Sequence, residues 1–164
     1  MNYLKEVATG YTTTRAKGSF WQIRINPQTA KVIETKPLVE QACEFPTVAA
    51  SDVGQNLQRT YLSIHRPGVN IAIEMFGAIA CFDHHAETLT VADLGENRYP
   101  TEPLYVPNEA DPQRGWVITV VFDGLKNRSE VWIFDANQLD AEPVCCLGLP
   151  SIVPNGFHGD WQTA

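Results

Sequence analysis

The stretch GWVITVVFDGLKNRSEVWIFDA, residues 115–136, decides the fold class. Two runs rich in β-branched and aromatic residues, 115–123 and 129–136, flank the polar sequence GLKNR, which is typical of a turn. The pattern predicts a β-hairpin whose two strands are apolar enough to be buried.

Similar runs recur along the rest of the chain. Residues 20–25 place Trp21, Ile23 and Ile25 on one face and polar residues on the other, which predicts a half-buried strand. The turn sequence NPQTAK follows and VIETKPL returns, so residues 20–38 are predicted to form a hairpin. Further strands are predicted at 59–65, 78–84, 87–94 and 144–150.

No long amphipathic helix competes with these strands. Residues 135–143 could form one helical turn, but the segment is too short and too polar for a packed helix. The predicted class is therefore all-β, a sandwich or a propeller, with hairpins recurring at roughly the 40 to 45 residues of a propeller blade. We expect residues 1–18 to form a loosely held lead-in and residues 19–164 to form one β domain.

Composition excludes several classes of function. The net charge is −7, and the 12 basic residues are scattered, so no basic stripe favours a nucleic-acid partner. Lys5 and Glu6 interrupt the place where a signal peptide needs an apolar run, and no segment reaches the roughly 20 apolar residues of a membrane span. These features predict a cytoplasmic protein. The four cysteines show no CxxC spacing, which favours reduced thiols in the core.

Among the four histidines, His158 has the most distinctive setting. It lies in VPNGFHGDW, residues 153–161, where flanking glycines allow close backbone contacts and aromatic residues can anchor the segment. This arrangement fits either a metal ligand held in a fixed direction or a structural turn. His65, before a Pro-Gly turn, and the adjacent His84 and His85, at a hairpin turn, are interpreted as structural or surface residues.

Several further motifs follow one another along the chain: CEFPTV (43–48), HRPG (65–68), FGAIACFDH (76–84), YPTEPLYVP (99–107), residues 115–136, AEPV (141–144) and LPSIVPNGFHGDW (149–161). In this order they resemble the C-terminal part of the carotenoid cleavage oxygenases, and the resemblance runs from about Phe20 to Trp161. CEFPTV and HRPG look most like the cyanobacterial apocarotenoid oxygenases.

The resemblance implies the C-terminal blades of a seven-bladed β-propeller with Fe2+ on its axis, bound by four histidines. It implies that His158 is the last of these ligands. It also implies that Glu44 and Glu102 are carboxylates that accept hydrogen bonds from ligand imidazoles. Phe45, beside Glu44, is a candidate for the wall of an apolar substrate tunnel.

The implied reaction is the splitting of a polyene double bond of a carotenoid or apocarotenoid by dioxygen into two carbonyl products. The chain offers no match to the other three histidine ligands, and its length suits three to four blades in an open arc. We therefore expect inactivity without a complementary N-terminal polypeptide. The alternative is a non-catalytic relic or interaction module. A lipophilic substrate would also allow peripheral contact with membranes.

Overall fold

The computed structural model describes residues 18–71, 74–111, 114–154, 156 and 158–162. Regular structure in these residues is almost entirely β-strand, with one short 3-10 helix at Ala50–Asp52. The predicted all-β class is confirmed, and residues 136–144 form turns and bends. Of the predicted lead-in, residues 1–17 lie outside the described residues, while the carbonyl of Gly18 accepts a hydrogen bond of 3.0 Å from Cys43 N.

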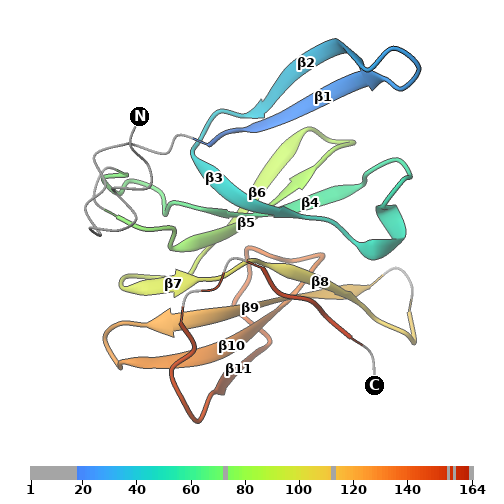
Figure 1. Cartoon of the computed structure of the whole chain (residues 1–164). Coiled ribbons are helices and arrows are strands. Elements are labelled where there is room, and N and C mark those ends of the chain that lie inside the picture. Colours follow the sequence, from blue (N-terminus) through green and yellow to red (C-terminus); the bar gives the residue numbers. More distant parts are fainter. Residues whose placement is uncertain (1–17, 72–73, 112–113, 155, 157, 163–164) are drawn as a thin grey trace.

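The strands form three antiparallel sheets, stacked as Figure 1 shows. The first sheet holds β1 (Phe20–Asn26) and β2 (Lys31–Val39). The second holds β3 (Cys43–Thr47), β4 (Arg59–Ile64), β5 (Ala78–Asp83) and β6 (Thr88–Asp93). The third holds β7 (Arg98–Pro100), β8 (Leu104–Pro107), β9 (Gly115–Asp123), β10 (Arg128–Asp135) and β11 (Cys145–Gly148). The hairpin predicted at 115–136 is therefore confirmed as β9 and β10.

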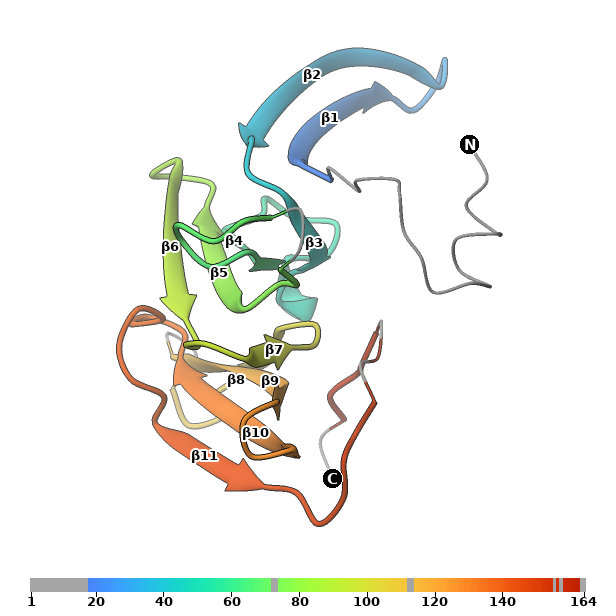
Figure 2. The ribbon, with the colours of Figure 1, turned by 90° about the vertical axis from the view of Figure 1, so that its left-hand side faces the viewer.

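The third sheet repeats the plan of the second. β7 pairs with one end of β9 and β8 pairs with the other end, so the two short strands make one interrupted row. Each of these sheets is then a meander of four rows, which is the unit of a propeller blade. We call the row that contains β3, or β7 and β8, the inner row, and the row of β6 or β11 the outer row. The C-terminal segment, the described residues after β11 (149–154, 156 and 158–162), returns to the inner side (Figure 2).

The second sheet is buried on both faces. One core cluster faces the third sheet and contains Tyr61, Ile79, Cys81, Ala92, Leu94, Val117, Val121, Phe134, Ala136 and Leu139. The other lies toward the β1–β2 hairpin and contains Cys43, Leu62, Ile64, Ala78 and Ala80, with Phe20 packed against it. Burial on both faces explains why β4 and β5 are almost continuously buried along their length.

The first sheet differs from its sequence-based prediction. The hairpin forms, but the predicted half-burial is wrong: Trp21, Ile23 and Ile25 are 48%, 56% and 55% exposed. Its Phe20 end packs against the second sheet, and Lys36 of β2 pairs with Glu87 in the turn before β6. The described residues thus make two four-row sheets and one two-strand hairpin, fewer than the three to four blades expected from length.

Candidate metal-binding site

Glu102 lies at the interruption between β7 and β8. The neighbouring Thr101 fixes this interruption, because its N–H donates to Val120 O at 2.8 Å. Its carbonyl accepts from Ser63 Oγ at 3.0 Å and from Thr119 Oγ1 at 3.1 Å. Strands of both complete sheets therefore hold the backbone on which Glu102 sits, and they position its carboxylate at the inner row.

The C-terminal segment returns from the outer row to the inner row. After β11, Leu149 N donates to Ser129 O at 2.9 Å, and Val153 N donates to Ser129 Oγ at 3.0 Å. Ser129 is fully buried at the start of β10. From this anchor the segment runs along the inner side of the third sheet, as its dark red trace shows in Figure 2.

Glu102 binds this segment through both carboxylate oxygens. Oε1 lies 3.1 Å from His158 Nδ1, and Oε2 accepts from Gly159 N at 2.9 Å. An ionised carboxylate can only accept, so with Glu102 ionised Nδ1 is the donor, and in a neutral imidazole Nε2 is then the nitrogen with a free lone pair. The Glu102 side chain is 9% exposed and that of His158 is 76% exposed. A buried carboxylate therefore holds an imidazole that faces the solvent.

Glu44 occupies the matching place in the second sheet. It pairs with Ser63, and the register of β3 shifts between Glu44 and Thr47. Phe45, within the shift, has a φ of 56°, a left-handed conformation that is uncommon outside glycine. Both glutamates therefore lie where the inner row is irregular, and both are followed closely by proline in EFP and EP.

A groove of about 530 Å³ connects three of the predicted site residues. Its lining is Glu44, Phe45, Pro46, Met75, Phe76, Tyr99, Pro100, Gly156 and His158. The Phe45 and His158 rings meet edge to face, with centroids 6.1 Å apart. Within the described residues no hydrogen bond joins Glu44 to His158. The structure thus brings Glu44, Phe45, Glu102 and His158 into one place, mostly apolar apart from the carboxylates and the imidazole.

The other histidines have different surroundings. His65 is buried, its Nδ1 lies 3.2 Å from Met75 O, and its ring packs on Phe76, so it supports a wall of the groove. His84 Nε2 lies 2.9 Å from Thr60 Oγ1, and burial lowers the pKa of this imidazole despite the nearby Asp83. His85 is exposed. In the part of the chain that the structure describes, no group of three or more His, Cys, Asp or Glu residues is placed to hold a metal.

The cysteines match their prediction only in part. All four are free thiols, and Cys43 and Cys81 are buried. Burial, together with the charge of Glu44, raises the pKa of Cys43 to about 11, and burial raises the pKa of Cys81 to about 11. The prediction of core thiols is wrong for Cys145 and Cys146, because β11 is the outer row of its sheet and leaves Cys145 half-buried and Cys146 exposed.

Sequence reasoning missed the residues that support the site. Ser63, Thr101, Thr119 and Ser129 hold the backbone of the inner row or the C-terminal segment, and single hydroxyl residues within strands gave no signal for this. The groove-lining Met75, Phe76, Tyr99 and Pro100 were also missed. The prolines that follow both glutamates within two residues, Pro46 and Pro103, are the signal that could have marked the irregular inner rows.

The family model described as retinal pigment epithelial membrane protein matches residues 2–163. The chain belongs to this family, the carotenoid cleavage oxygenases. This confirms the resemblance that the motifs indicated.

Curated relatives support the same assignment. The apocarotenoid-15,15'-oxygenase of Synechocystis sp. is 29% identical over 147 residues, covering 88% of this chain and 29% of the relative. The carotenoid 9,10(9',10')-cleavage dioxygenase 1 of Arabidopsis thaliana is 33% identical over 157 residues, covering 87% of this chain and 28% of the relative. The chain therefore spans less than a third of the length of these relatives.

Solved structures show the same fold. A variant of the Synechocystis apocarotenoid oxygenase superposes with a TM-score of 0.81 at 27% identity, covering 94% of this chain and 33% of that one. A cobalt-substituted form of that oxygenase gives 0.80 at 27% identity, covering 93% and 32%. The oxygenase is a β-propeller enzyme, so the expectation that the chain forms part of a propeller is confirmed. Among the described residues, no helix is long and apolar enough to cross a membrane.

Proposed function

We propose that this chain forms the C-terminal portion of an Fe2+-dependent dioxygenase that splits a polyene double bond of a carotenoid or apocarotenoid. The proposal rests on the two contacts of the Glu102 carboxylate, one with His158 Nδ1 and one with Gly159 N. A carboxylate that binds one imidazole nitrogen and aims the other outward is the usual arrangement behind a histidine that ligates a metal.

The residues present fit one position of an iron site. His158 would offer Nε2 as a neutral ligand, and Glu102 would fix its tautomer and direction. Glu44, in the matching place of the second sheet, would orient a ligand imidazole from the rest of the propeller. When bound, ferrous iron would supply the activation of dioxygen for addition across the double bond, which yields two carbonyl products.

The groove beside His158 supplies the substrate side of the proposal. Phe45, Phe76 and Met75 give it an apolar wall that can bind a polyene through its π-face and exclude water. Orienting one double bond near the metal is the contribution that the protein makes to such a reaction. A substrate this lipophilic is also the reason to expect peripheral membrane contact, with the protein itself in the cytoplasm.

The remaining three imidazoles of a four-histidine site must come from outside the described residues. We propose that an N-terminal portion of the propeller supplies them, and that the chain by itself binds iron weakly. The alternative, a non-catalytic module, provides no reason for a buried carboxylate to hold an exposed imidazole.

Reconstitution tests the proposal. The chain is expressed together with the part of the Synechocystis apocarotenoid oxygenase that precedes the matched segment, and an apocarotenoid is supplied with ferrous iron and air. Chromatography is expected to show two carbonyl fragments from the mixture and none from either part alone. Correct assembly without any product would favour the non-catalytic module.

A further inference from the structure

The β1–β2 sheet is incomplete by the standard of its neighbours. The second and third sheets each have four rows, added outward in chain order from an inner row to an outer row. β2 leads directly into β3, the inner row of the next sheet, as β6 leads into β7. By this order β2 is an outer row and β1 the row beside it, so two inner rows are absent from the described residues.

Among the described residues, no strand pairs with the edge of β1 that faces away from β2. Trp21 pairs with Pro37 and Ile23 pairs with Thr35. Proline has no N–H to give to a neighbour, so Trp21 and Pro37 form a pair whose backbone groups point away from each other. Ile23 and Thr35 are two residues along and belong to the same kind of pair. The N–H and C=O groups of Trp21 and Ile23 therefore point to the edge away from β2.

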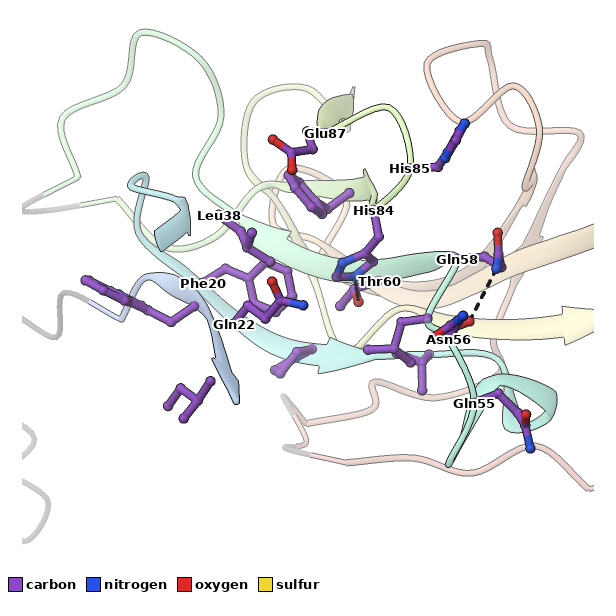
Figure 3. Close-up of a pocket in the computed structure, with 16 residues that line it drawn as sticks. Phe20, Gln22, Leu38, Gln55, Asn56, Gln58, Thr60, His84, His85 and Glu87 are labelled. Carbon is purple, nitrogen blue, oxygen red and sulfur yellow. Dashed lines mark hydrogen bonds between the residues drawn. The ribbon is translucent and has the colours of Figure 1, made fainter. Parts of the chain in front are cut away.

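A cavity of about 760 Å³ lies along this edge (Figure 3). It touches four consecutive residues of β1, 20–23, but only Leu38 of β2. Its opposite side comes from the second sheet, including Thr60, Phe82 and His84, and from the segment 55–58. The space is therefore a wedge between the edge of β1 and the neighbouring sheet, where further rows of the first sheet would lie.

We propose that the edge of β1 is the docking surface for an antiparallel β-strand of the N-terminal portion of the same propeller. This inference rests on the proposed function, and it names the edge and the residues through which the two portions join. The relatives carry more than two thirds of their length outside the matched part, which is ample chain for the missing rows.

The surroundings define the chemistry of the added strand. The amide side chains of Gln22, Gln55, Asn56 and Gln58 border the wedge and offer hydrogen bonds to polar side chains. On the other face of β1, Trp21 and Ile23 are about half exposed and offer apolar contact. The docking strand should therefore alternate, with side chains that meet both these amides and the apolar Leu57 and Phe82 toward the second sheet, and apolar residues beside Trp21 and Ile23.

Proline substitution tests the edge directly. In Ile23→Pro, the N–H that points to the added strand is lost, while the β1–β2 hydrogen bonds of the neighbouring residues remain. The matched control is Thr35→Pro, at the residue that pairs with Ile23. It also removes one N–H, but this N–H points to the edge of β2 away from β1. The full chain and both variants are titrated with the N-terminal portion of the Synechocystis apocarotenoid oxygenase, because strand pairing through the backbone tolerates differences in side chains.

The expected result is that Ile23→Pro weakens binding by roughly tenfold or more, while Thr35→Pro leaves it unchanged. Hydrogen exchange should show protection of Trp21 and Ile23 amides only in the complex. If the two portions bind each other but neither retain iron nor cleave the substrate, the docking is supported and the proposed activity is not. Three results would overturn it: no binding by the unchanged chain, equal effects of both variants, or loss of self-association in Ile23→Pro with binding to the N-terminal portion unchanged, which would assign the edge to a second copy.

Discussion

Glu44 and Glu102 lie at irregular positions of the inner rows, and this irregularity sets the direction of their carboxylates. A regular strand turns alternate side chains to the two faces of its sheet, so neither face directs a carboxylate along the sheet plane. The interruption at Glu102 and the register shift after Glu44 release the backbone from this alternation. Hydrogen bonds from Ser63 and Thr119 to Thr101 make the interruption rigid.

Glu102→Gln in the reconstituted protein should lower iron affinity by about 10 to 100-fold. Glutamine replaces one of the two acceptor oxygens by an NH2 group, so it keeps only one of the two contacts with His158 Nδ1 and Gly159 N. The direction of His158 and the tautomer of its ring are then less well fixed. Titration of iron into the apoprotein measures the change. Glu142→Gln, at an exposed position, is the control and should bind iron normally; equal affinities in both variants would contradict the role of Glu102.

His84 should make stability depend on pH. Burial lowers its pKa in the folded chain below the ordinary 6.5, so the unfolded chain binds a proton that the folded chain resists. Stability is then highest above pH 6.5 and falls as the pH drops through 6.5 toward the lower folded pKa. Urea unfolding at pH 7.5 and 5.5 should show a larger loss for the unchanged chain than for His84→Gln. The exposed His85→Gln should behave like the unchanged chain, and the same loss in both variants would exclude His84 as the cause.

At the scale of elements, regular strands could be predicted from sequence and irregular ones could not. β4, β5, β9 and β10 contain β-branched and aromatic runs between turn residues, and each forms within a residue or two of its expected range. β3, β7 and β8 were not predicted as strands, because Pro46, Pro100, Pro103 and Pro107 break the pattern. Proline is tolerated there because an inner row pairs on one side only.

The same contrast applies to the candidate site. The residue types of Glu44, Glu102 and His158 could be identified only through the resemblance of their motifs, since a glutamate at a strand end is commonly solvated. Their convergence depends on pairing between strands distant in sequence and on the return of the C-terminal segment to the inner row. Local patterns carry no information on such contacts.

The C-terminal segment should depend on one serine. Ser129→Ala removes the hydroxyl that accepts from Val153 N and leaves that N–H without its partner. We expect the segment after β11 to be cleaved faster in limited proteolysis, with the β-sheet signal in circular dichroism retained. Ser151→Ala, at an exposed position of the same segment, is the control. Equal cleavage rates would mean that Ser129 does not anchor the segment.

At the scale of the whole molecule, the described residues form an arc with two apolar ends. Trp21, Ile23 and Ile25 are exposed at one end, while Val144 and Trp161 are exposed at the other, beside a surface groove on the third sheet. A closed propeller covers such surfaces and leaves only short, protected edges.

The chain alone should therefore self-associate as its concentration rises, since exposed strand edges and apolar faces pair with one another. Light scattering measures the mean mass, and adding the N-terminal portion of a relative should reduce the association by covering these surfaces. A monodisperse monomer with cooperative thermal unfolding would contradict an open arc.

Iron content of the reconstituted protein tests the central claim most directly. His158→Ala removes the imidazole that Glu102 holds, but it changes an exposed side chain outside the core, so circular dichroism should be unchanged. Elemental analysis after gel filtration should find iron in proportion to the unchanged protein and almost none in His158→Ala. Full iron content in His158→Ala would show that this histidine is a structural turn residue and that the site proposed here is wrong.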